Sequence, residues 1–252
     1  MGDFNDIYYI CFIDLMGQTK FFSGIQSAEV GPDIMMEVER VSDGLREMVR
    51  YAKNRYARNF SADDDVGVEL FSDSILLSIK AVDGKYDNLA PWFDMIIKLV
   101  YIACRCKLPF RGGLTKGLAA RSESGSIYGV GVDEAMRLEQ NHADFFRIIL
   151  SSNLAEELSN TEDVWRYLEI DLDSAVVLNY AGAYVLKRSE FSKEMSALFE
   201  IQKWVKDQFE YFRYTDDDLH NKCADSKLAR RYKMWHDFLV LQALKMRIRC
   251  DV

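Results

Sequence analysis

The stretch IYYICFI, residues 7–13, decides the fold class because it is an unbroken run of β-branched, aromatic and other apolar residues. Such a run is typical of a strand buried on both faces, whereas a surface strand alternates apolar and polar residues. Residues 66–71 and 74–80 predict two further strands, which the tight Ser72-Asp73 corner joins into a hairpin. A long helical pattern separates the first strand from this hairpin.

The rest of the chain continues this alternation of helices and strands. Further helices are predicted for residues 92–103 and 133–142, and further strands for residues 110–120, 126–132, 146–150 and 174–180. The order β-α-β-β-α-β with later strands predicts an α+β sandwich, a ferredoxin-like, palm-type sheet with helices on one face. We expect one domain over residues 1–188 and a C-terminal helical extension, residues 189–252, packed on it or on a dimer partner.

Composition excludes several classes of protein. The apolar runs of the 252-residue chain fall far short of the roughly 18 residues that a membrane-spanning helix needs. The net charge of −8 argues against broad binding to nucleic acid, but not against binding a nucleotide. The five scattered cysteines indicate reduced thiols, and the acidic first residues are unlike a secretory signal. We therefore expect a cytoplasmic globular protein with neither a membrane nor a nucleic-acid partner.

Two aspartates stand out by their context. Asp14 ends the first predicted strand just before a turn at Gly17, and Asp73 lies at the tip of the predicted hairpin. If the strand lies beside the hairpin, both carboxylates reach the same edge of the sheet, where they repel each other. A divalent cation such as Mg²⁺ or Mn²⁺ removes that conflict and also binds substrate phosphates. The alternative is that Asp14 caps a helix and Asp73 is a turn residue.

Four segments in a fixed order carry a family resemblance. They are FIDLMG (residues 12–17), FSDS (71–74), FRGGLTKG (110–117) and IYGVGVDEAMRLE (127–139). Together they resemble the class III nucleotidyl cyclases, in which an R-x-G-x-x-x-G strand leads to a segment ending in A-x-R-L-E. The resemblance implies that the main domain is a catalytic domain that cyclises a nucleoside triphosphate and releases pyrophosphate.

The resemblance also implies roles for individual residues. Asp14 and Asp73 would hold two divalent ions, Mn²⁺ or Mg²⁺, with the backbone carbonyl of Leu15 as a further ligand. Gly17 and its neighbours would hold the phosphates. Arg137 matches the arginine that stabilises charge on the reacting α-phosphate.

The helix that follows the glycine-rich segment departs from the family pattern at one position. Asp133 takes the place of an asparagine that orients the ribose in the family. Asp133 either accepts a hydrogen bond from a ribose hydroxyl or only caps the helix. The alternative interpretation of Arg137 is a solvated helix residue that pairs with Glu134 or Asp133.

Two positions match those that read the base in the family. Adenylyl cyclases have lysine at the first and aspartate at the second, whereas this chain has Glu69 and Ser126, so the adenine pattern is absent. A carboxylate at Glu69 can accept from guanine N1–H and N2–H₂, from uracil N3–H or from cytosine N4–H₂. The alternative is that Glu69 is an exposed strand residue.

The layout is most similar to one branch of the family, the stand-alone bacterial pyrimidine cyclases of the Pycsar anti-phage systems. FSDS replaces the usual I-G-D, GQT replaces GFT, and a helical tail follows the core. The resemblance implies a homodimer with active sites at the interface, Mn²⁺ as the metal, and UTP, with CTP as second choice, cyclised to the 3′,5′-cyclic monophosphate. The alternatives are a guanylate-type cyclase and a non-catalytic nucleotide-binding regulatory module. Retention of both aspartates and the arginine favours the enzyme.

Overall fold

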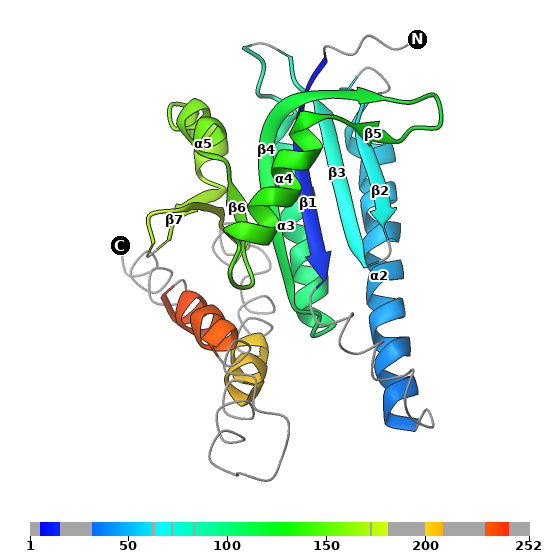
Figure 1. Ribbon diagram of the computed structural model, residues 1–252, viewed down its shortest axis with the longest axis vertical. Helices are drawn as coiled ribbons and strands as arrows, with labels where there is room; N and C mark the ends of the chain where they lie inside the picture. Colours follow the sequence, from blue (N-terminus) through cyan, green and yellow to red (C-terminus); the bar gives the residue numbers. More distant parts are fainter. Residues whose placement is uncertain are drawn as a thin grey trace.

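The first half of the chain forms a βαββαβ unit (Figure 1). The computed structural model describes residues 6–15, 32–61, 64–71, 73–82, 84–171, 173–180, 200–208 and 230–241. The elements of the unit are β1 (Asp6–Leu15), α2 (Pro32–Asn59), β2 (Gly67–Phe71), β3 (Ser74–Lys80), α3 (Leu89–Arg105) and β4 (Phe110–Arg121). The second half adds β5 (Ile127–Tyr128), α4 (Val130–Asn141), β6 (Ile148–Leu150), α5 (Ser152–Leu158), α6 (Glu162–Trp165), β7 (Leu168–Ile170) and β8 (Val176–Leu178).

The described strands form one eight-stranded sheet. Its order is β2-β3-β1-β4-β6-β8-β7, and β5 pairs with β4 outside this path. β1 runs antiparallel to both of its neighbours, β3 and β4, whereas β4 and β6 are parallel. The order of the first four strands is that of a ferredoxin-like sheet. The predicted α+β fold with a palm-type sheet is therefore confirmed.

β1 is buried on both faces of the sheet, as its sequence predicted. Cys11 and Ile13 belong to a large core that includes residues of α2 and α3, whereas Ile10 and Phe12 pack with Ala135 of α4. Alternate side chains of β1 thus serve two separate apolar layers, which is why the strand shows no polar alternation.

The prediction that helices cover one face of the sheet is wrong. α4 lies across the face opposite to α2 and α3 (Figure 1). The glycines of β4 permit this arrangement, because a Cβ atom at Gly113 would lie 2.1 Å from the carbonyl oxygen of Ala135. A Cβ atom at Gly117 would lie 2.6 Å from Cα of Gly131. The glycine-rich segment therefore makes room for a helix.

The boundary before α4 also differs from the prediction. The expected strand over residues 126–132 is limited to Ile127–Tyr128, and α4 begins at Val130. Gly129 stands between them with φ at 145°, a backbone conformation that side chains of L-residues rarely adopt. This glycine allows the chain to pass directly from strand to helix.

The described part of the predicted extension packs into the main core of the same chain. It comprises residues 200–208 and 230–241. Tyr232 and Trp235 pack against Phe146, and Trp235 Nε1 donates a hydrogen bond of 2.6 Å to the hydroxyl of Tyr180. Trp235 is completely buried in the core that also contains α3. The division at residue 188 stays a prediction. No helix among the described residues is long and apolar enough to cross a membrane.

Candidate active site

The two aspartates lie at the same end of the sheet. Asp14 is paired in register with Ser74 of β3 and with Arg111 of β4, and Asp73 occupies the turn that joins β2 to β3. The backbone N–H of Leu15 donates a hydrogen bond of 3.1 Å to the carbonyl of Asp73. The structure therefore brings together three of the residues singled out from the sequence. Gly17 lies outside the described residues.

The surroundings of Asp14 leave its charge partly compensated. Ser74 Oγ donates a hydrogen bond of 3.1 Å to Asp14 Oδ1, and Arg111 Nε lies 3.7 Å from Oδ2. Burial raises the pKa of the Asp14 carboxyl, and the charge of Asp73 adds to the rise, while Ser74 and Arg111 oppose it. A carboxylate whose charge is disfavoured by burial and by a neighbouring carboxylate is suited to a divalent cation.

The donor set fits Mg²⁺ or Mn²⁺, which prefer oxygen ligands and retain positions for substrate phosphates. The chain offers the Asp14 and Asp73 carboxylates and the nearby Leu15 backbone. No group of three or more His, Cys, Asp or Glu side chains among the described residues could hold a metal ion. A metal here would complete its coordination with water or other oxygen ligands.

Arg111 and Glu139 belong to this end of the sheet, although neither residue was assigned a role from the sequence. Arg111 forms an ion pair with Glu139 of α4, whose side chain is only 2% exposed. Burial raises the pKa of Glu139 to about 7, with Asp14 adding to the rise and Arg111 opposing it. Both residues are within the motifs that carry the family resemblance, so the motifs were the only available signal.

Arg137 and Asp133 are both exposed on α4. The side of α4 that faces β4 contains Gly131 and Ala135, and residues two positions further on point about 200° away around a helix. Neither side chain forms a hydrogen bond or ion pair with another described residue. Asp133 does not cap α4 either, because the N-cap is Gly129. The helix-cap alternative for Asp133 is therefore wrong.

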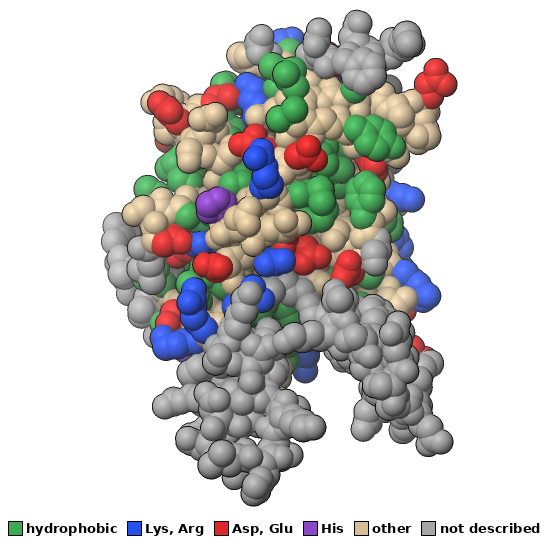
Figure 2. Space-filling view, in the orientation of Figure 1, with side chains coloured by type: hydrophobic (Ala, Val, Ile, Leu, Met, Phe, Trp, Pro, Cys, Tyr) green, Lys and Arg blue, Asp and Glu red, His purple; other side chains and the backbone are tan. Residues whose placement is uncertain are grey.

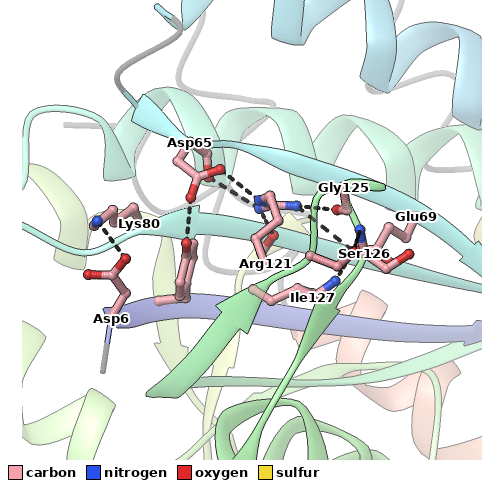
Figure 3. Close-up of polar contacts among 11 residues, drawn as sticks. Asp6, Asp65, Glu69, Lys80, Arg121, Gly125, Ser126 and Ile127 are labelled. Carbon is pink, nitrogen blue, oxygen red and sulfur yellow. Dashed lines mark hydrogen bonds and ion pairs between the residues drawn. The ribbon is translucent and has the colours of Figure 1, made fainter. Parts of the chain in front are cut away.

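The two positions matched to base recognition meet at the β4–β5 hairpin (Figure 3). Glu69 Oε1 accepts a hydrogen bond of 2.9 Å from the backbone N–H of Ile127, the residue after Ser126. The Glu69 side chain is 15% exposed, so it is not the exposed strand glutamate of the alternative reading. Its carboxylate is held against the hairpin with one oxygen engaged.

Arg121 connects this hairpin to the rest of the sheet, a role that no pattern in the sequence indicates. Figure 3 shows its guanidinium between Asp65 and the loop at Gly125. Its Nε lies 2.6 Å from Asp65 Oδ1, and its Nη1 donates a hydrogen bond of 2.8 Å to the carbonyl of Gly125. The same Nη1 is 3.9 Å from Glu69 Oε1. A Cβ atom at Gly67 would lie 2.4 Å from Nη1, so that glycine leaves space for the guanidinium.

We expect Arg121→Gln to lower the free energy of unfolding by about 3 kcal/mol, because it leaves the partly buried Asp65 without its cationic partner. The Lys80–Asp6 pair at the same end of the sheet is a matched control, since its side chains are 37% and 36% exposed. Lys80→Gln should cost less than about 1 kcal/mol. Urea unfolding of the three proteins measures both values, and equal losses would contradict a special role for Arg121.

Comparison with known proteins gives similarity of structure only. No protein-family model and no curated protein matches the chain. The guanylyl cyclase Cya2 aligns with a TM-score of 0.47 and 16% identity, over 71% of this chain and 93% of that one. The catalytic core of a rhodopsin-guanylyl cyclase with converted specificity, in complex with ATPαS, aligns with a TM-score of 0.47 and 13% identity, over 70% and 97%.

The non-canonical dimeric guanylyl cyclase domain of the RhoGC fusion protein from Blastocladiella emersonii aligns with a TM-score of 0.41 and 16% identity, over 61% of this chain and 83% of that one. At these values the alignments carry no argument about activity.

Proposed function

We propose that the chain is a nucleotidyl cyclase of the class III type, which converts a nucleoside triphosphate to its 3′,5′-cyclic monophosphate and pyrophosphate. The observation that carries the proposal is the meeting of Asp14, Leu15 and Asp73 at one end of the sheet. In the reaction the ribose 3′-oxygen bonds to the α-phosphorus, the bond from that phosphorus to the bridging oxygen breaks, and the hydroxyl proton leaves to solvent.

The chain's own residues would supply binding and orientation for this step. Asp14, Asp73 and the Leu15 carbonyl would hold two divalent ions, Mn²⁺ or Mg²⁺. When bound, such ions supply a lowered pKa for the 3′-hydroxyl and charge neutralisation for the phosphates. Arg137 would stabilise the charge that develops on the α-phosphate, and Asp133 would accept from a ribose hydroxyl.

The exposure of Arg137 and Asp133 supports active sites shared across a homodimer. Both residues point away from the sheet of their own chain, so in this proposal they serve the carboxylates of the partner subunit. Large apolar side chains are exposed around the start of α4, with Leu118, Tyr128 and Val130 exposed by 49%, 62% and 65%. Figure 2 shows apolar side chains gathered on this face of the molecule, as an interface between subunits requires.

The contact of Glu69 supports a pyrimidine rather than guanine. Guanine presents N1–H and N2–H₂ side by side, and both oxygens of a carboxylate are needed to accept from them. Glu69 Oε1 already accepts from Ile127, so guanine would have to share that oxygen, whereas a single donor such as uracil N3–H can use Oε2 alone. We therefore favour UTP, then CTP. A second-messenger role in anti-phage defence, in the cytoplasm, belongs to the same proposal and rests on the sequence layout.

A competition among the four nucleoside triphosphates at equal concentration tests the choice of base. We expect cyclic UMP as the main product. Cyclic CMP would keep the pyrimidine assignment and reverse the order within it, whereas cyclic GMP would refute it and make Glu69 a guanine reader.

Glu69→Gln should lower kcat/KM for the preferred nucleotide by roughly ten- to a hundredfold, because the bond to a charged acceptor is lost. Glu123, which is exposed in the same hairpin, provides the matched control. Glu123→Gln should leave kcat/KM unchanged. An unchanged value in Glu69→Gln would exclude Glu69 from base recognition.

A further inference from the structure

One guanidinium serves two carboxylates at the proposed metal site. Arg111 Nε lies 3.7 Å from Asp14 Oδ2 and forms an ion pair with Glu139 Oε1. The three side chains come from three elements, β4, β1 and α4. Their burial is unequal, because Glu139 is 2% exposed whereas Arg111 and Asp14 are 20% and 23% exposed. Arg111 therefore lies between the partly exposed carboxylate of Asp14 and the buried carboxylate of Glu139.

The position of Glu139 is fixed by the close contact between α4 and β4. A Cβ atom at Gly113 would lie 3.0 Å from the backbone nitrogen of Glu139 and 2.6 Å from Cβ of Leu138. The helix therefore cannot approach β4 further, and the side chain of Glu139 stays almost completely buried. Arg111 is the cation that forms an ion pair with it.

Arg111 also competes with any cation that approaches Asp14. A guanidinium turned fully toward Asp14 Oδ2 would occupy a carboxylate oxygen that a divalent ion needs, and its positive charge would repel that ion. An ionised carboxylate on the other side of Arg111 weakens this competition. Glu139 is placed to be that anion.

We propose that Glu139 is a positioning residue that holds Arg111 away from Asp14 and so leaves the Asp14 carboxylate available to a divalent cation. The inference rests on the proposed function, because it takes Asp14 as a metal ligand. It adds two residues, Arg111 and Glu139, that act on the affinity for the metal without touching it.

The test is the affinity of the full chain for Mn²⁺ alone, measured by equilibrium dialysis up to millimolar concentrations, without nucleotide. Glu139→Gln keeps the shape of the side chain and removes its charge, so Arg111 turns to Asp14. We expect the Kd for Mn²⁺ to rise about tenfold, the effect typical of losing a group that orients a metal ligand.

Glu157→Gln is the matched control. Glu157 pairs with Lys116, which lies on β4 like Arg111 but faces the core on the other side of the sheet, and the two side chains are 25% and 22% exposed. Loss of this pair should leave the Kd for Mn²⁺ unchanged. A rise in Kd equal to that of Glu139→Gln would show a general effect of breaking ion pairs on β4 and would overturn the inference.

The double variant Arg111→Met/Glu139→Gln separates positioning from loss of structure. It removes the competing guanidinium as well, so the Kd for Mn²⁺ should return to the wild-type value or below. If Glu139→Gln acted by damaging the structure, the second substitution would add to the damage and the Kd for Mn²⁺ would stay high. A double variant that binds Mn²⁺ as weakly as Glu139→Gln therefore overturns the inference. Circular dichroism of each variant shows whether the protein is folded.

The outcomes also distinguish this inference from the proposed function. Wild-type protein that binds Mn²⁺ and shows the expected pattern, but cyclises no nucleotide, contradicts the proposed activity and supports the role of Glu139. Cyclising protein with an unchanged Kd in Glu139→Gln contradicts only the role of Glu139. Wild-type protein that does not bind Mn²⁺ contradicts both.

Discussion

Asp73→Ala is expected to lower the rate of cyclisation by at least about a thousandfold, because loss of a metal ligand removes several kcal/mol of transition-state stabilisation. The fold should survive, since Asp73 occupies the turn between β2 and β3 and its backbone carbonyl still accepts from Leu15. Asp14→Asn should have an equal effect while keeping an acceptor for Ser74. The measurements are kcat with Mn²⁺ and the circular dichroism spectrum.

Asp87→Ala serves as the control for these variants. Asp87 is exposed in the turn before α3, beyond the end of β3 that lies away from Asp73. Its loss should leave kcat within about twofold of wild type, as expected for a surface substitution. Near-wild-type turnover in Asp73→Ala would rule out the assignment of Asp14 and Asp73 as metal ligands.

Mixing two inactive variants, Asp73→Ala and Arg137→Ala, is expected to restore activity to about a quarter of that of the wild-type protein. Random exchange makes half of the dimers mixed, and each mixed dimer has one intact site of two. The physical reason is the direction of Arg137, which is exposed on α4 and bonds to no described residue of its own chain.

The control for the mixing experiment is Asp14→Asn with Asp73→Ala. Both changes fall on the same half of the shared site, so no mixed dimer contains an intact one and no activity should return. If subunits exchange and Asp73→Ala with Arg137→Ala still remain inactive, all of the groups act within one chain.

The sequence predicted the fold where the local pattern was unambiguous. The apolar run of β1 predicts a buried strand, and the Ser72-Asp73 corner predicts a hairpin. Both strands of the hairpin formed where expected. The helices on both faces could not be predicted, because the glycines Gly113 and Gly117 were consistent with a bulge as well as with a close helix. Only the packing of α4 distinguishes the two.

The candidate site likewise contains one contact that the sequence predicts and others that it does not. Asp14 and Asp73 could be paired from the sequence because a strand end and a hairpin tip meet at one edge of a sheet. Arg121 and Asp65 are 56 residues apart, and their contact depends on the registers of the paired strands from β2 through β3 and β1 to β4, which the sequence does not specify. The Arg111–Glu139 pair depends in the same way on where α4 crosses β4.

The most direct test of the central claim is the mass of the product formed from each nucleoside triphosphate with Mn²⁺. We predict a 3′,5′-cyclic monophosphate together with an equal amount of pyrophosphate, from UTP above the others, and no product from Asp73→Ala. A linear monophosphate or diphosphate, or no product from any of the four nucleotides, would contradict the assignment of this chain as a nucleotidyl cyclase.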